Sequence, residues 1–190
     1  MESKIINISV ILFCAIMISC SSKPMKNKVE YQCEIDDIKS IKNGKISIHE
    51  VTEKESKIVL KPVEDIKELI VGCKADEIFP IEIGILKNLE ILILGGGNFE
   101  KMPSEIGNLH KLKLLILITT SLKFMPIEFY KIPTIQRLAV MYNLNEFEFQ
   151  EELCNLEFEL NVWKTTTKFK EIPARLENQN RLKIETKEAH

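Results

Sequence analysis

The pattern of hydrophobic positions repeats along the middle of the chain. Aliphatic residues recur as L-x-x-L-x-x-L-x-L from Leu86 to Leu94, and again with a 23-residue offset from Leu109 to Leu117. A fixed period of this length is typical of stacked short units, because a single unit of this size cannot bury its own apolar side. The pattern therefore predicts a chain built as a stack rather than around one closed core.

The same register extends in both directions from these two stretches. It continues at equivalent positions in the preceding and following units: Val63, Ile66, Leu69 and Val71, then Ile132, Ile135, Leu138 and Val140. We expect each L-x-L segment to form a short strand, and the strands to pair as a parallel sheet on the concave side of the stack. Side chains two residues apart share a face of a strand, so Leu92 and Leu94 should both point inward.

Prolines mark the second half of each unit. Pro80, Pro103 and Pro126 follow the 23-residue period, and Phe149 stands at the next expected place. Pro173 comes one position later than a further full period would place it. This spacing predicts one inserted residue in the loop between Leu144 and Leu153. It leaves open whether Leu160 or Val162 is the equivalent of Leu92.

These motifs resemble the leucine-rich repeat family, in the form whose second half reads L-x-x-L-P-x-x-I-G-x-L. The resemblance covers residues 63–176 and implies an α/β solenoid with a parallel concave sheet and about four to five repeats, placed here at 62–185 with a tail at 186–190. The family places asparagine or cysteine just after the strand. Only one of the four positions in this chain matches: Lys74, Gly97, Thr120 and Asn143.

A different pattern precedes the repeats, and it predicts a β-rich amino-terminal cap at residues 31–61. Ile46 and Ile48 alternate with polar residues, residues 52–56 are wholly polar, and Lys57 to Leu60 is rich in β-formers. Together they predict a strand, a turn and a second strand. A stack needs such an element, because its first unit would otherwise leave an apolar end and an open strand edge in water.

The segment 1–19 has the form of an export signal. Lys4 precedes the mainly apolar run 5–18, which is too short for an ordinary membrane-spanning helix. The segment ending in Ser19-Cys20 is similar to the lipobox of bacterial lipoproteins. That resemblance implies cleavage after Ser19, acylation of Cys20, a tether at 20–30 and an outer-membrane location with the leaflet open. An ordinary cleaved signal and an uncleaved anchor are the alternatives.

Composition and charge exclude several classes of function. Of the 190 residues, 45% are hydrophobic, and 26 basic against 28 acidic residues give a net charge of −2. Nucleic acid binding needs a concentrated basic surface, so we expect no nucleic acid partner. The three histidines are His49, His110 and His190, and no nucleophile with a matching base is evident. We therefore expect neither an enzyme nor a cofactor.

The strand residues that face away from the predicted core are mostly aliphatic. Soluble monomers seldom leave large apolar patches uncovered, so this face is our candidate for binding a protein partner. The candidate residues are Ile70, Ile91, Ile93, Leu114, Ile116, Ile118, Arg137, Ala139 and Met141. Three alternatives stay open: the tail or cap folds over the face, the family tolerates aliphatic strands, or the protein is a structural envelope protein that associates with itself.

Cysteines and acids supply two further candidates. In an oxidising compartment Cys33 and Cys73 would pin the cap to the first repeat, although Cys154 allows two other pairings. Six carboxylates lie close together in the sequence without a base among them: Glu146, Glu148, Glu151, Glu152, Glu157 and Glu159. Nothing in their spacing resembles a calcium loop, so we interpret them as solvated charge and expect no metal site.

Overall fold

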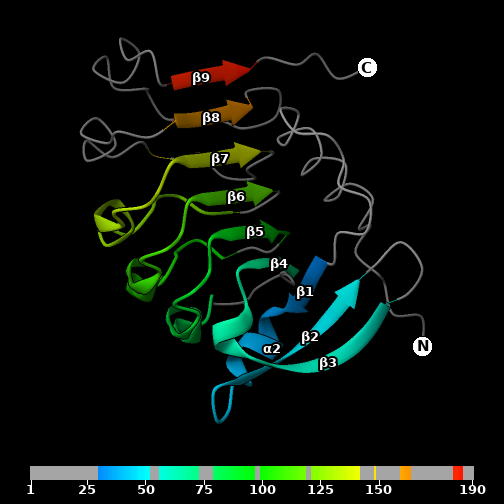
Figure 1. The fold of residues 1–190 in the computed structure, drawn as a ribbon. Helices are drawn as coiled ribbons and strands as arrows, with labels where there is room; N and C mark the ends of the chain where they lie inside the picture. The colour runs from blue at the N-terminus through cyan, green and yellow to red at the C-terminus, as the bar shows by residue number, and fades with distance from the viewer. Residues whose placement is uncertain are drawn as a thin grey trace.

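A computed structural model of the chain describes residues 30–51, 56–72, 79–96, 99–118, 121–141, 148, 159–163 and 182–185. These residues are organised around one sheet of nine strands in the order β3-β2-β1-β4-β5-β6-β7-β8-β9 (Figure 1). The strands are β1 (Glu30–Glu34), β2 (Lys45–Val51), β3 (Ser56–Pro62), β4 (Glu68–Gly72), β5 (Ile91–Gly95), β6 (Leu114–Ile118), β7 (Arg137–Met141), β8 (Glu159–Trp163) and β9 (Leu182–Glu185).

Strands β4 to β7 pair in parallel with the register that the sequence predicts. Leu69 pairs with Leu92, Leu92 with Leu115, and Leu115 with Leu138, so each step along the sheet is one 23-residue unit. Every unit thus contributes the same strand positions to the next. The stacked arrangement with a parallel sheet is confirmed for this part of the chain.

The unit after β7 is shorter than the sequence analysis expects. Leu138 pairs with Leu160, one position short of the 23-residue period, and Leu160 pairs with Leu182. The prediction of an inserted residue between Leu144 and Leu153 is therefore wrong for the strand-to-strand spacing. Leu160, and not Val162, is the equivalent of Leu92. The error arose from counting prolines, which mark the return half of a unit and do not fix the strand.

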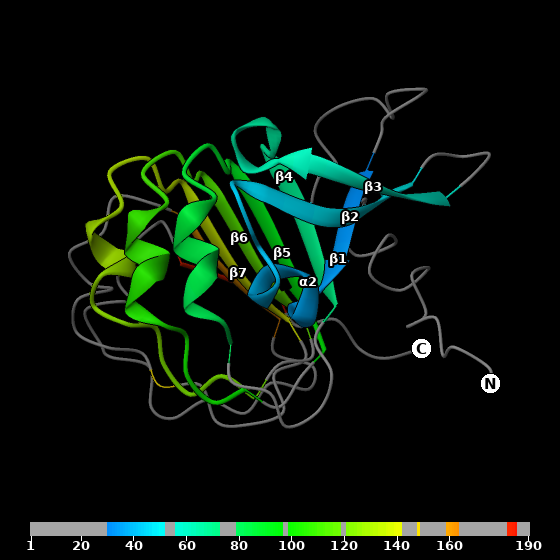
Figure 2. The same ribbon diagram turned by 90° about the horizontal axis from the view of Figure 1, so that it is seen from below.

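Short 3₁₀ helices form the return half of the units and line the opposite side of the stack (Figure 2). They are η2 (Ile81–Ile85), η3 (Ser104–Asn108) and η4 (Phe129–Lys131), whereas η1 (Val63–Asp65) follows β3 directly and lies at the entry to β4. Pro80 and Pro103 immediately precede η2 and η3. A proline is well placed there, because its fixed φ suits a helix start and its missing N–H has no partner to lose.

Two glycines let neighbouring return segments approach each other closely. A Cβ on Gly84 would lie 2.8 Å from the Glu105 carbonyl oxygen, and a Cβ on Gly107 would lie 2.6 Å from the Glu128 Cβ. Neither separation leaves room for a side chain. Glycine at these two positions therefore serves the packing of one unit on the next.

The segment before β4 extends the sheet instead of forming a separate layer. β1 pairs in parallel with β4 and antiparallel with β2, and β2 forms an antiparallel pair with β3. The strand pair expected from the alternation at residues 46–60 is therefore present as β2 and β3. β1 and the short helix α2 (Ile35–Lys39) were not expected, since neither has a clear period over its five residues.

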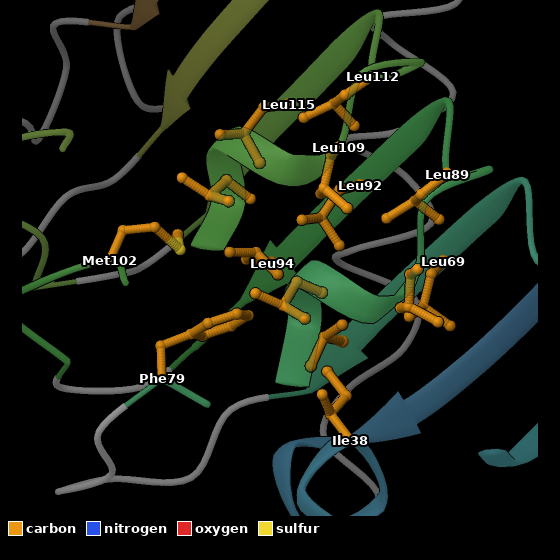
Figure 3. Close-up of a cluster of buried hydrophobic side chains, with 14 of the residues drawn as sticks. Ile38, Leu69, Phe79, Leu89, Leu92, Leu94, Met102, Leu109, Leu112 and Leu115 are labelled. Carbon is orange, nitrogen blue, oxygen red and sulfur yellow. The ribbon is translucent and has the colours of Figure 1, made fainter. Parts of the chain in front are cut away.

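The core lies between the sheet and the return segments (Figure 3). Leu92, Leu94 and Leu115 are fully buried, and the Phe79 and Phe99 rings lie 5.2 Å apart between adjacent units. At the amino-terminal end the core is continued by four residues of β2 and α2: Ile35, Ile38, Ile46 and Ile48. The described residues include no helix long and apolar enough to cross a membrane.

Candidate functional site: the second face of the sheet

A second apolar cluster lies on the face of the sheet that is turned away from the return segments. We call it the second-face cluster. It consists of Ile93, Ile116, Ile118 and Ala139, with Ile70, Ile91 and Leu114 packed against it. It is separate from the main core, because successive side chains of a strand point to opposite faces.

The strand register brings the predicted binding residues together as expected. Ile70, Ile93, Ile116 and Ala139 form one row across β4 to β7, because each pairs with the next. Ile91, Leu114 and Arg137 form the row beside it, with Glu68 at its amino-terminal end. Met141 pairs with Ile118 through the backbone, and its side chain lies outside the described residues.

Burial along this face is uneven. Ile93, Ile116, Ile118 and Ala139 are 7%, 1%, 2% and 0% exposed, whereas Ile70, Ile91 and Leu114 are half-buried. The sequence analysis placed these residues on one face and expected a cover for it, with a protein partner as the first candidate and the tail or cap as alternatives. The alternation of a strand fixes the direction of a side chain and carries no information about what lies over it.

Polar contacts between units lie where the chain enters each strand. The Lys113 ammonium donates to the Glu90 carboxylate at 2.6 Å, and this hydrogen bond is the main reason that the pKa of Glu90 is lowered below its usual value. Lys111 donates to the Asn88 side-chain oxygen at 2.8 Å. Main-chain bonds run alongside, such as that from the Lys113 N–H to the Glu90 carbonyl at 2.8 Å. These contacts join successive units at the entry to each strand.

The one-unit register of β4 to β7, together with the return helices η2, η3 and η4 between these strands, decides the architecture. The fold is a leucine-rich repeat solenoid. Its core is formed by the leucines that recur in each strand and at the entry to each strand. The residue types on its second face can differ from repeat to repeat.

Two solved leucine-rich repeat structures are similar to this chain. The Leptospira interrogans LRR protein LIC12759 is 23% identical, with a TM-score of 0.42, over 60% of this chain and 40% of that one. The LRR ectodomain of the receptor kinase SOBIR1 from Arabidopsis thaliana is 15% identical, with a TM-score of 0.43, over 85% of this chain and 93% of that one. This chain thus spans less than half the length of the Leptospira protein. No protein-family model matches the sequence, and no curated protein matches it.

Several candidate residues lie outside the part of the chain that the structure describes. They are the lipidation residue Cys20, the cysteines Cys73 and Cys154, the strand-end positions 74, 97, 120 and 143, Pro173, and four of the acidic residues, Glu146, Glu151, Glu152 and Glu157. Cys33 is described and is buried in β1, where it pairs with Val71, so its predicted disulfide with Cys73 stays a prediction.

The described part of the acidic stretch shows no ligand arrangement. Glu148 lies within reach of the preceding unit, and its backbone N–H donates to the Lys123 carbonyl at 2.6 Å. Among the described residues no three metal-ligating side chains lie together. Glu148 is thus placed by the stacking of the repeats.

Proposed function

We propose that this protein is an exported, lipid-anchored module of the bacterial envelope that binds another protein on the second face of its sheet. The observation that supports binding at this place is the second-face cluster itself. A leucine-rich repeat solenoid needs one apolar face for its core, and this sheet has two. An apolar face opposite the core of a sheet is normally covered, and a protein partner is one such cover.

The proposal also concerns how accessible the second-face cluster is to a partner. Ile116 and Ala139 are almost completely buried in the full-length chain. We infer that binding requires this part of the face to become accessible. The half-buried residues Ile91 and Leu114 would make the first contact, because they are paired on neighbouring strands and both are more accessible than Ile93 and Ile116.

We further propose that residues 31–61 act as an amino-terminal cap and that each parallel strand from β4 to β9 belongs to one repeat. Support for the cap comes from Ile38 and Ile46, which close the end of the core before the first repeat. Counted in this way the solenoid has six repeats, one for each strand from β4 to β9, whereas the sequence analysis expected four to five. The additional strand is β9, at the carboxyl end of the predicted repeat region 62–185.

Site-directed photocrosslinking in the producing bacterium tests the binding face. A benzophenone amino acid at position 91 or 114 should give a crosslink to one other protein, whereas the same group at position 81, on the exposed return segment, should not. The pair Ile91→Glu and Leu114→Glu should abolish capture. We choose these residues because a glutamate at Ile116 would be buried without a partner and could unfold the chain.

The outcomes separate the two functional classes. Crosslinks to a distinct protein support the binding module, and crosslinks only to another copy of the chain support the structural, self-associating envelope protein. Equal crosslinking from positions 91 and 81 would discard both. Mass spectrometry of the mature amino terminus tests the anchor: Cys20 should carry the added acyl mass, and Cys20→Ser should release the protein from the membrane fraction.

A further inference from the structure

A tight turn near the amino-terminal end of the sheet places an asparagine directly before a glycine. Asn43 and Gly44 have φ angles of 51° and 68°, and they connect Lys42 to Lys45, which face each other as an antiparallel bridge. Two successive residues with positive φ match the turn type in which Asn-Gly is a preferred sequence. The turn lies on the connection from α2 to β2 (Figure 1).

Both residues of this turn are accessible to solvent. Asn43 and Gly44 are exposed, and so are Lys42 and Lys45 on either side. In the described part of the chain, an ideal Cβ on Gly44 would meet no heavy atom within 4 Å apart from its chain neighbours. The residue after an asparagine normally shields its own main-chain nitrogen with its side chain. Glycine lacks that shield, so the Asn43 side chain can reach the Gly44 nitrogen.

The described hydrogen bonds around the turn join Lys42 to Lys45 and Gly44 to Val63. The Lys45 N–H donates to the Lys42 carbonyl at 3.0 Å, and the Lys42 N–H donates to the Lys45 carbonyl at 3.2 Å. The Gly44 carbonyl accepts from the Val63 N–H at 2.8 Å. These three bonds are made by atoms other than the Gly44 nitrogen and the Asn43 side-chain amide. A reaction between those two groups therefore breaks none of the three bonds directly.

We propose that Asn43 is a site of spontaneous deamidation, at which the side chain and the main chain of the turn react with each other. The main-chain nitrogen of Gly44 attacks Asn43 Cγ, the new C–N bond closes a succinimide ring, and the Cγ–Nδ2 bond breaks. Ammonia leaves with the proton that the Gly44 nitrogen carried. A solvent water then opens the ring at either carbonyl, which gives aspartate or isoaspartate at position 43.

The two products differ in their effect on the turn. Aspartate leaves the main chain unchanged and suits the same turn type, because Asp-Gly shares the preference of Asn-Gly. Isoaspartate directs the main chain through the side-chain carbon and lengthens it by one methylene. The Gly44 carbonyl would then be displaced from the Val63 N–H, at the first residue of η1. Isoaspartate at position 43 would thus loosen the contact between this turn and the entry to β4.

Asn88 provides the comparison within the same chain. It is followed by Leu89, whose side chain is fully buried. The Asn88 side-chain amide donates to the Glu64 carbonyl at 2.8 Å, and its oxygen accepts from the Lys111 ammonium at 2.8 Å. The leucine side chain and these two bonds hold the Asn88 amide away from the main-chain nitrogen that would attack it. We expect Asn88 to stay intact under conditions in which Asn43 reacts.

Timed incubation of the full chain, purified in a mild detergent, tests the proposal. The folded protein is kept in a mildly alkaline buffer made with heavy-oxygen water, and samples are then digested in ordinary water with a glutamate-specific protease. The peptide that ends at Glu50 contains position 43, and deamidation adds one heavy oxygen to it. Mass spectrometry measures the extent of reaction. An isoaspartate-specific methyltransferase measures how much of the product is isoaspartate.

We expect position 43 to react at a rate within about tenfold of that in a free peptide of residues 40–47, because an exposed two-residue turn opens locally at little cost. Asn88 should react at least about tenfold more slowly than Asn43. Asn43→Gly keeps a sequence that suits the turn and should abolish the modification. Deuterium exchange of the Val63 N–H should become faster as the wild-type protein is incubated, and it should stay constant in Asn43→Gly.

Four results would overturn the proposal. The first is an intact Asn43 over a period in which the free peptide is converted, and the second is equal rates at Asn43 and Asn88. The third is a product that contains aspartate without isoaspartate, because ring closure yields both. The fourth is an equal increase in Val63 exchange in Asn43→Gly, which would show that the contact loosens for another reason. Circular dichroism of each sample establishes that the protein stays folded during the incubation.

Discussion

The two faces of the parallel sheet differ in how strictly their residues repeat. On the core face the same position is leucine in four successive strands, namely Leu69, Leu92, Leu115 and Leu138, and all four are buried. On the second face the neighbouring row changes from Ile70 to Ala139 across the same strands, and its burial changes with it. The residues of the core face are constrained by packing against the units above and below. The residues of the second face are constrained only by what packs over that face.

The largest effect should come from the core face. Leu115→Ala removes a fully buried side chain between two units, so it should lower the free energy of unfolding by about 2–5 kcal/mol. Chemical denaturation measures the loss. Ile127→Ala, on an exposed part of the return side, is the control and should change stability by less than about 0.5 kcal/mol. Similar losses for both would contradict the stacked core.

The close approach of return segments should give the next largest effect. Gly107→Ala places a methyl group where the Glu128 backbone and Cβ already lie, so it should destabilise by about 1–3 kcal/mol. Ser104→Ala, three residues earlier on the exposed side of η3, is the matched control. A stable Gly107→Ala variant would show that the repeats are spaced more widely than the structure has them.

A smaller effect distinguishes the second face from an open surface. Ile116→Val removes one buried methylene and should cost about 0.5–1.5 kcal/mol in the full chain, whereas Ile58→Val on the exposed edge should cost almost nothing. Chemical denaturation of both variants measures the two costs. Equal costs would contradict the burial of the second face.

The smallest effect should come from the polar contacts at the strand entry. The Lys113 hydrogen bond lowers the pKa of Glu90, so the folded state favours the ionised carboxylate. The stabilisation is therefore present above the unfolded pKa, near 4.5, and is lost as the pH falls through the lower folded pKa. Glu90→Gln should lower Tm by no more than about 2 °C at pH 7, and high salt should reduce the difference. A difference in Tm between the two proteins that persisted at pH 3 would show that it does not come from the ionised Glu90 carboxylate.

The repeating part of the fold could be predicted from the sequence, because the residues that recur with the 23-residue period are the residues that pack between neighbouring units. Leu92 and Leu115 are buried by each other's units, so their spacing fixes the strand register. β8 was harder to place, because Pro173 marks the return half of its unit and that half varies in length. α2 was missed because five residues are too few to display a helical period.

The candidate site was predicted only in part, for a different physical reason. Alternation along the strands correctly grouped Ile93 with Ile116, since it fixes which face a side chain takes. The near-complete burial of Ile116 depends on neighbours that no local pattern encodes. For the same reason the exposure of Ile58 and Leu60 could not be read from a segment that had been interpreted as an ordinary cap strand.

The reversal of strand direction between β1 and β2 also limits how this molecule can lengthen. β1 is parallel to β4, but β2 and β3 alternate in direction beyond it. A duplicated unit needs a neighbour of its own polarity on each side, so it fits only within the series from β4 to β9. Growth of the gene by tandem duplication would therefore add length on the carboxyl side of β1 and leave the hairpin as a fixed amino-terminal boundary.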